Sequence, residues 1–183
     1  PISVSAFTGS FIEKAQISDA KAMALLTPGV SGDTDDSFLD SMNVRGISTN
    51  DFGVGAEPSI GVYQDGIYLG RTGGALSSFF DIELVEVVKG PQGTLFGRNT
   101  IGGVISVNRT QPTGEFGVKL EATFGEEDLT DIKGIINLPL GDRGGVKLSF
   151  KDVESDSHVY NTTLNDRRPM KDSSTASISV KYD

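Results

Sequence analysis

The sequence predicts an α+β unit, with a small mixed sheet and short helices, followed by a run of antiparallel β-strands. Two observations predict this division. The first 110 residues hold 16 of the 23 glycines, and their short segments change hydrophobic period repeatedly, which favours a small mixed unit. From residue 111 onward apolar and polar residues alternate, which indicates strands with one apolar and one polar face. We therefore predict a first domain over residues 1–110, a linker over 111–114 and a second domain over 115–183.

The first domain begins with a predicted strand over residues 2–7. The run Ser10-Phe11-Ile12-Glu13 has the capping-box pattern and predicts the start of a short helix. A second helix is expected over residues 19–26, ended by Pro28-Gly29, because neither residue continues a helical ladder. An acidic loop over residues 33–40 follows. Four further strands are predicted, at Met42–Arg45, Ser59–Gln64, Leu84–Val88 and Gly103–Asn108.

The second domain contains four segments in which one set of alternating residues is apolar. The apolar sets are Phe116, Val118, Leu120, Ala122 and Phe124; Ile132, Gly134, Ile136, Leu138 and Leu140; Val146, Leu148 and Phe150; and Ala176, Ile178, Val180 and Tyr182. A tight turn is predicted over residues 141–145 and a long polar loop over 154–173. Alternating strands with short turns at one end and long loops at the other are typical of outer-membrane barrels. A soluble antiparallel sheet with one wet face alternates in the same way, so the residues alone leave both readings open.

Composition excludes several classes of protein. The chain has 183 residues, a net charge of -9, no cysteine and one histidine. Disulfides, thiol nucleophiles and Cys/His zinc sites are therefore excluded, and an acidic chain is a poor ligand for nucleic acid. The sequence has no run of about 18 apolar residues, as a membrane helix needs. No secretory leader is visible either, so the N-terminus is expected to be processed or truncated.

The patterns that mark enzymes and cofactor sites are also missing. The glycine-rich run from Gly90 to Arg98 lacks the lysine of a phosphate-binding loop, and His158 has no nucleophile pattern beside it. The carboxylates at residues 33–36 lack the spacing of a calcium loop. We therefore expect no enzyme, no metal and no cofactor.

Three segments of the first domain carry a resemblance to a known family. They are Asn43–Ile47 with its Arg-Gly pair, Gly61–Tyr68 with its Tyr-x-Asp-Gly sequence, and the long run Asp81–Val107 with Gly-Pro-Gln-Gly and Gly-Gly. In this order and spacing they resemble the plug domain of TonB-dependent outer-membrane receptors. Residues 115–183 resemble the first four strands of the family's barrel, which has about 22 strands. The resemblance thus implies a plug domain followed by an incomplete transmembrane β-barrel, a fragment in the outer membrane of a Gram-negative bacterium.

The resemblance also implies roles for charged residues. Arg45 and Lys89 are similar in position to basic plug residues that pair with barrel carboxylates and hold the plug in place. An ion pair to Glu83 or Glu86 within the plug is the alternative, since such pairs also form without functional consequence. Leu84 stands where the family usually has a basic residue.

The function that the resemblance implies is active import of a scarce large solute, with the plug gating the barrel lumen. The solute would be an iron-siderophore complex, cobalamin or a carbohydrate. The partners would be the TonB energy-transducing protein, whose contact segment is not visible here, and outer-membrane lipid. Ligand contacts are predicted in two Gly-rich segments, residues 50–57 and 70–78. The candidates there are Asn50, Asp51, Phe52 and Arg71, and the cationic and aromatic groups among them suit anionic or catechol-bearing chelates. A soluble periplasmic or secreted binding module derived from the plug is the alternative.

Overall fold

The computed structural model describes residues 3–24, 26–32, 42–49, 57–70, 79–163 and 166–182. The chain divides into two compact units, residues 1–110 and residues 111–183, and each is described by itself. The predicted acidic loop at residues 33–40 lies outside the described residues.

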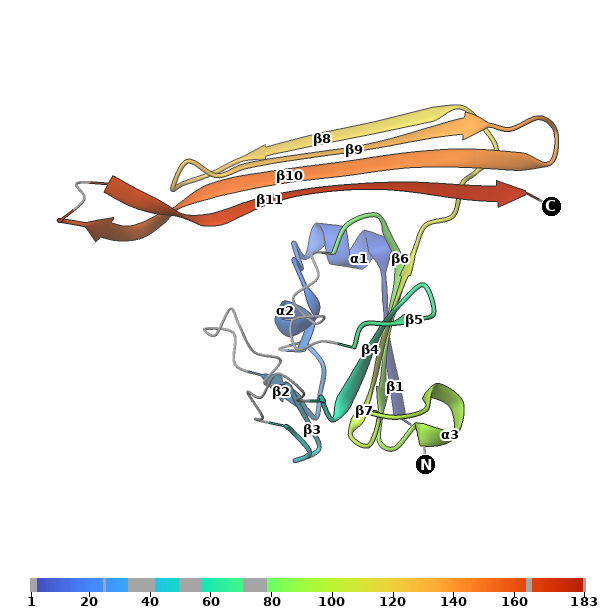
Figure 1. Cartoon of the computed structure of the whole chain (residues 1–183), viewed down its shortest axis with the longest axis vertical. Coiled ribbons are helices and arrows are strands. Elements are labelled where there is room, and N and C mark those ends of the chain that lie inside the picture. The colour runs from blue at the N-terminus through green and yellow to red at the C-terminus, as the bar shows by residue number, and fades with distance from the viewer. Residues whose placement is uncertain are drawn as a thin grey trace. The chain divides into compact units, whose positions relative to one another are not determined.

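Unit 1 is built on a five-stranded mixed sheet (Figure 1). Its strands, in spatial order, are β1 (Ser3–Thr8), β6 (Ile82–Lys89), β7 (Gly103–Arg109), β4 (Ile60–Gln64) and β5 (Ile67–Tyr68). Strands β4 and β7 are parallel, and all other neighbours are antiparallel. A separate two-stranded sheet pairs β2 (Val30–Gly32) with β3 (Met42–Val44). The expected mixed sheet is therefore confirmed. Strand β2, which was not predicted, belongs to the separate two-stranded sheet.

The described part of unit 1 contains the helices α1 (Gly9–Lys14), α2 (Ala20–Ala24) and α3 (Gly93–Phe96). The prediction that Ser10 caps the first helix is wrong. Thr8 is the N-cap, and its Oγ1 accepts a hydrogen bond of 3.4 Å from the amide of Phe11. Thr8 already has the extended backbone that an N-cap needs because it ends β1, so the helix starts earlier.

The second helix begins as expected, with Asp19 accepting a bond of 2.8 Å from the amide of Ala22. The chain turns after this helix, and Gly29 has a positive φ of 78° there.

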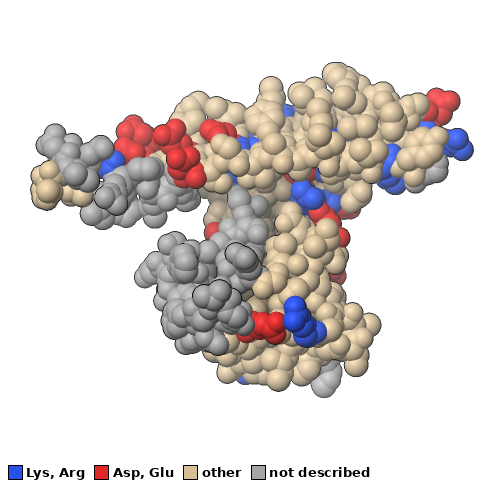
Figure 2. Space-filling model, in the orientation of Figure 1, with Lys and Arg blue, Asp and Glu red and all other residues tan. Residues whose placement is uncertain are grey.

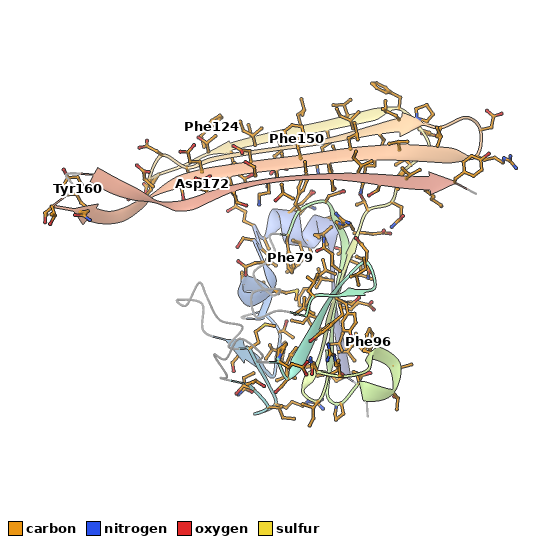
Figure 3. All side chains as sticks on the ribbon, in the orientation of Figure 1. Phe79, Phe96, Phe124, Phe150, Tyr160 and Asp172 are labelled. Carbon is orange, nitrogen blue, oxygen red and sulfur yellow. The ribbon has the colours of Figure 1, made fainter. Side chains whose placement is uncertain are left out.

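The core of unit 1 lies between the sheet and the short helices. Its buried apolar side chains include Phe79, which Figure 3 labels. The core set is Ile12, Ile17, Ala20, Met23, Met42, Val44, Ile60, Val62, Phe79, Val85, Val87, Ile105 and Val107. Alternate residues of β6 contribute Val85 and Val87 at 0% and 1% exposure, so one face of this strand is covered by the core.

Unit 2 is a four-stranded antiparallel sheet in the order β11-β10-β9-β8. The strands are β8 (Gly117–Phe124), β9 (Thr130–Pro139), β10 (Gly144–Asn161) and β11 (Asp166–Tyr182). Sequential strands pair with each other, and the sheet remains open at β8 and β11. The expectation of antiparallel strands after the mixed unit is confirmed.

The predicted long polar loop over residues 154–173 is wrong. Most of that segment is strand, because β10 and β11 continue to pair with each other beyond the apolar residues, from Glu154↔Asp172 as far as Asn161↔Asp166. Pairing is carried by backbone hydrogen bonds, which need no apolar side chains, so the loss of alternation at residue 152 did not mark the end of the strand.

Candidate functional site

Lys89, a predicted plug-locking residue, is buried at the end of β6. Its residue exposure is 8%, and its Nζ donates to Ser5 Oγ and to the carbonyl oxygen of Pro28, each at 3.1 Å. The two acceptors come from β1 and from the turn after α2. Lys89 therefore fastens two segments that are distant in sequence, and both of these acceptors are uncharged.

Arg45, the second predicted locking residue, lies in a turn. Sequence patterning placed it in a strand over Met42–Arg45, but β3 ends at Val44, and Arg45 and Gly46 have φ values of 54° and 85°. The amides and carbonyls of Val44 and Ile47 bond to each other across these two residues at 3.0 Å, which makes a two-residue hairpin turn. Glycine at residue 46 suits this turn because it tolerates positive φ.

The structure brings Arg45 close to the end of β6. Its Nη1 atom lies 3.7 Å from the position that a Cβ would have on Gly90, the residue after Lys89. Arg45 is exposed, whereas Lys89 is buried. Two cationic residues that are 44 positions apart in the sequence are therefore gathered at one end of the unit 1 sheet.

The alternative pairing of Lys89 with Glu83 or Glu86 is not formed among the described residues. Glu86 is an odd number of residues from Lys89 on the same strand, so it faces the opposite side of the sheet. Glu83 is exposed at a register shift between Ile82 and Leu84, about 20 Å along the strand from Lys89 at 3.3 Å per residue. A lysine side chain does not span that separation.

The four predicted ligand contacts, Asn50, Asp51, Phe52 and Arg71, lie outside the described residues. Their role stays a prediction. The described residue at the end of the first predicted ligand segment is Glu57, and its carboxylate forms an ion pair of 2.9 Å with Arg98.

Aromatic residues hold α3 and its following loop to the β4–β5 hairpin. The ring of Tyr63 lies 5.3 Å from Tyr68 and 5.0 Å from Phe96, and its hydroxyl donates to the carbonyl of Phe96. Asn99 donates to the Tyr68 hydroxyl at 2.7 Å. Burial, with a smaller contribution from Tyr68, raises the pKa of Tyr63. These residues stand inside the quoted motifs, but sequence analysis assigned them no role.

Asp65 was also quoted in a motif without a role. It sits at φ 50° in the turn between β4 and β5, where it accepts from both the backbone amide and the Nε of Arg109, at 2.9 Å and 2.6 Å. Arg109 ends β7, the last strand of unit 1. The carboxylate thereby fastens the hairpin to the end of the unit. The Asp-Gly pair is the available sequence signal, since these residues favour positive φ.

The sheet of unit 2 has two chemically different faces. Directly paired residues share a face, and one row across the four strands consists of Val118, Ile136, Leu148 and Ile178. Large apolar side chains of this face are exposed, with 72% for Phe116, 73% for Phe124 and 72% for Ile178. Figure 3 labels Phe124 and Phe150 on this sheet. A continuous exposed apolar surface of this kind marks a face that meets lipid or another apolar partner.

The opposite face is polar and carries ion pairs. Lys133 Nζ lies 3.0 Å from Glu121 Oε1 and 3.6 Å from Asp131 Oδ2, and Lys151 Nζ lies 3.8 Å from the same Asp131 oxygen. Beside them the hydroxyls of Ser149 and Ser177 are 2.7 Å apart. The alternation predicted from sequence is thus confirmed as one apolar and one polar face.

Carboxylates gather at the end of the sheet away from the β9–β10 turn (Figure 2). They belong to Glu126, Glu127, Asp128, Asp152, Glu154, Asp156 and Asp172. Glu127 forms an ion pair with Arg167, and its carbonyl accepts from the amide of Asp156 at 2.7 Å. In the described parts of both units no group of three or more His, Cys, Asp or Glu residues could hold a metal ion. Nor is any helix described there long and apolar enough to cross a membrane.

Comparison with known proteins identifies the class to which this fold belongs. The family model described as the TonB-dependent Receptor Plug Domain matches residues 1–104. The chain therefore belongs to the family of TonB-dependent receptors and contains its plug domain. Receptors of this family lie in the outer membrane of Gram-negative bacteria, and that membrane is the location of this chain.

Particular relatives include two curated receptors. The catecholate siderophore receptor Fiu of Escherichia coli K12 is 35% identical over 114 residues, which are 62% of this chain and 15% of Fiu. The pesticin receptor of Yersinia pestis is 30% identical over 112 residues, which are 57% of this chain and 16% of that receptor. The chain thus spans about a sixth of the length of these curated relatives.

Solved structures show the same fold. The ferric yersiniabactin uptake receptor FyuA of Yersinia pestis superposes with a TM-score of 0.80 at 21% identity, over 96% of this chain and 27% of FyuA. The ferripyoverdine receptor of Pseudomonas aeruginosa gives a TM-score of 0.69 at 22% identity, over 86% of this chain and 21% of that chain. The plug domain followed by antiparallel strands, expected from sequence, is confirmed.

Proposed function

We propose that the chain is part of an outer-membrane active transporter that imports an iron-siderophore complex. Unit 1 would gate the lumen of a barrel to which the strands of unit 2 belong. The observation that carries the proposal is the combination of a plug domain with a sheet whose exposed apolar face and polar face suit lipid on one side and a lumen on the other. The catecholate siderophore receptor and the ferric yersiniabactin uptake receptor above support the choice of solute.

The gating step assigns roles to this chain's own residues. Lys89 and Arg45 would hold the plug through carboxylates on other strands of the receptor, because neither pairs with Glu83 or Glu86 in unit 1. The energy-transducing protein TonB would supply the force that moves the plug. Asn50, Asp51, Phe52 and Arg71 remain our proposed ligand contacts. Transport by such displacement needs no bond-making chemistry, so we propose no catalytic activity.

The exposed apolar face argues against the alternative of a soluble binding module. Phe116, Phe124 and Ile178 would all need cover from protein if lipid were absent. Cobalamin and carbohydrate remain the competing solutes.

Uptake of radioactive iron tests the proposal. A strain lacking the complete receptor is compared with one carrying it, each with and without its TonB protein, using ferric chelates of the catecholate, hydroxamate and mixed classes. We expect uptake of at least one chelate that requires both the receptor and TonB. Binding of cobalamin or an oligosaccharide by the purified receptor, without binding of any chelate, would replace the siderophore by that solute.

A further inference from the structure

We propose that Arg143 and Tyr182 form a binding site for the phosphate group of a membrane phospholipid. The site lies in unit 2, at the edge of the apolar face where the chain turns from β9 into β10. The inference rests on the proposed function, which places that face against lipid, and it names the lipid group that this edge of the face binds. It is carried by the way in which the end of β11 holds one guanidinium group.

Tyr182 ends the apolar face on β11. It pairs directly with Gly144, the first residue of β10, and its exposed fraction is 63%. A Cβ on Gly144 would stand 2.9 Å from Cδ2 of the tyrosine ring, so the glycine leaves room for the ring to lie across β10. A tyrosine at the edge of a membrane-facing surface keeps its ring beside the hydrocarbon and its hydroxyl in the polar layer.

Arg143 lies in the β9–β10 turn and is held by this tyrosine. Its Nη2 atom donates a hydrogen bond of 3.1 Å to the Tyr182 hydroxyl. Its Cζ atom lies 5.5 Å from the ring centroid, within the range of a cation–π contact. Because both contacts restrict the guanidinium, a ligand that binds it loses less conformational freedom. An arginine has more N–H donors than this hydrogen bond occupies, so donors remain for a ligand.

No carboxylate neutralises the guanidinium among the described residues. The ion pairs described in unit 2 do not include Arg143, and the adjacent Asp142 forms none with it. The arginine near the other end of β11, Arg167, is instead paired with Glu127. A guanidinium with available N–H groups binds phosphate oxygens through two parallel hydrogen bonds. Arg143 is therefore suited to a phosphate group.

The apolar residues beside the site favour a lipid as the source of that phosphate. One row further into the face, Val180 pairs with Val146, which pairs with Leu138. Val180 and Leu138 are 63% and 38% exposed. A phospholipid places its acyl chains on this row while its phosphate reaches Arg143, because basic side chains at a membrane interface extend to the headgroups. Free phosphate would gain only the contact with the arginine.

The opposite edge of the apolar face carries negative charge. There Asp152, Glu154 and Asp172 continue the rows of this face, within the acidic group that Figure 2 shows. The interval from Arg143 to Asp152 is close to the 9–11 residues with which a tilted strand crosses the hydrocarbon. Carboxylates repel phosphate, so the turn edge is the phosphate-binding edge of this sheet. Short turns of outer-membrane barrels lie on the periplasmic side, so the site belongs to the periplasmic leaflet.

Binding of single lipids to the purified complete receptor tests the site. Native mass spectrometry measures the fraction of receptor that retains a lipid during titration with phosphatidylglycerol, or with diacylglycerol, which has the same chains and no phosphate. Glycerol phosphate is added as a competitor that supplies free phosphate.

Three variants change the site, and a fourth is the control. Arg143→Gln removes the charge, Arg143→Lys keeps the charge without the guanidinium fork, and Tyr182→Phe keeps the ring without the hydroxyl. The matched control is Arg167→Gln, which removes an exposed arginine near the other end of β11.

We expect Arg143→Gln to lower the association constant for phosphatidylglycerol about fivefold, the usual contribution of one basic residue at a membrane surface. Arg143→Lys should lower it about twofold, because a lysine cannot form two parallel hydrogen bonds. Tyr182→Phe should also lower it about twofold, because the guanidinium is then less restricted. Arg167→Gln should match the wild type, and no variant should change the retention of diacylglycerol.

Equal binding of phosphatidylglycerol by Arg143→Gln and the wild type would overturn the inference. An equal loss of diacylglycerol, or displacement of the lipid by glycerol phosphate at the same concentration, would overturn it too. These outcomes leave the transport function intact, because chelate uptake is measured separately. A receptor that retains neither lipid would contradict the placement of the apolar face against lipid, and the inference with it.

Discussion

The ring of Phe150 occupies the space that a side chain on Gly134 would take. The two residues are directly paired between β10 and β9, and a Cβ built on Gly134 would stand 2.2 Å from Cε1 and 2.5 Å from Cζ of the ring. An aromatic ring lying over a cross-strand glycine covers backbone that would otherwise be exposed and compensates for the weak strand propensity of glycine.

Gly134→Ala should therefore expel the ring from its place. The added methyl group overpacks a filled site, and we expect a loss of about 1–3 kcal/mol in the free energy of unfolding. Phe150→Ala alone should also destabilise the sheet, by uncovering Gly134. Urea unfolding of the complete receptor in lipid vesicles measures both changes.

The double variant provides the control. With the ring absent, an alanine at residue 134 meets less resistance, so the two losses should fall short of additivity by about 0.5–3 kcal/mol. Additive losses would show that the ring and the glycine do not depend on each other.

Lysine on the apolar face should destabilise the receptor in membranes. Ile178 and Ser179 are neighbours on β11 that face opposite sides, and Ile178 is 72% exposed. We expect Ile178→Lys to lower the stability of the vesicle-embedded receptor by about 2–4 kcal/mol, since a charge then faces the hydrocarbon, and Ser179→Lys to cost far less. Equal effects from both variants would argue that the apolar face does not meet lipid.

Loss of the Lys89 ammonium should loosen β1 before the rest of unit 1. Lys89→Met removes the donor to Ser5 Oγ and to the Pro28 carbonyl, and we expect a local loss of about 1–3 kcal/mol. Hydrogen exchange of the β1 amides, compared with Lys14→Met as a surface control, measures it. If amide exchange became faster throughout unit 1, with no additional increase in β1, the prediction that Lys89 stabilises β1 in particular would be wrong.

Alkaline pH should weaken unit 1 through Tyr63. Burial raises the pKa of this phenol above its ordinary value of 10.0, so the folded form keeps its proton after the unfolded form has lost it. The free energy of unfolding is then unaffected below about pH 10 and falls as pH rises above it. The difference between wild-type and Tyr63→Phe unfolding curves isolates this loss, with Tyr160→Phe, at an exposed tyrosine, as the control. A difference curve that stays flat above pH 10 would rule the effect out.

Tyr63→Phe should also start from lower stability at neutral pH. The hydroxyl donates to the Phe96 carbonyl, and losing one such bond costs about 1 kcal/mol. The variant thus separates the loss of a hydrogen bond, present at every pH, from the ionisation that appears only under alkaline conditions.

The sequence by itself determined the two-faced strands of unit 2, because alternation of side chains is a local property of extended backbone. Val118, Leu148 and Ile178 were each assigned correctly to the apolar set of their own strand, and the observed strand register places them in one row. The ordered motifs of unit 1 were equally informative, since tight turns such as Asp65-Gly66 need particular residues wherever they occur.

Only the tertiary structure decided the contacts between distant segments. Lys89 meets the carbonyl of Pro28, which is 61 residues away. Its place on β6, six residues from Glu83 and on the face opposite to Glu86, rules out the ion pairs that charge alone allowed. The extension of β10 and β11 past residue 154 was likewise decided by a neighbouring strand. Backbone hydrogen bonds and buried polar contacts leave no periodic trace in the sequence, because they depend on which chain segment lies opposite and not on the residues next along the chain.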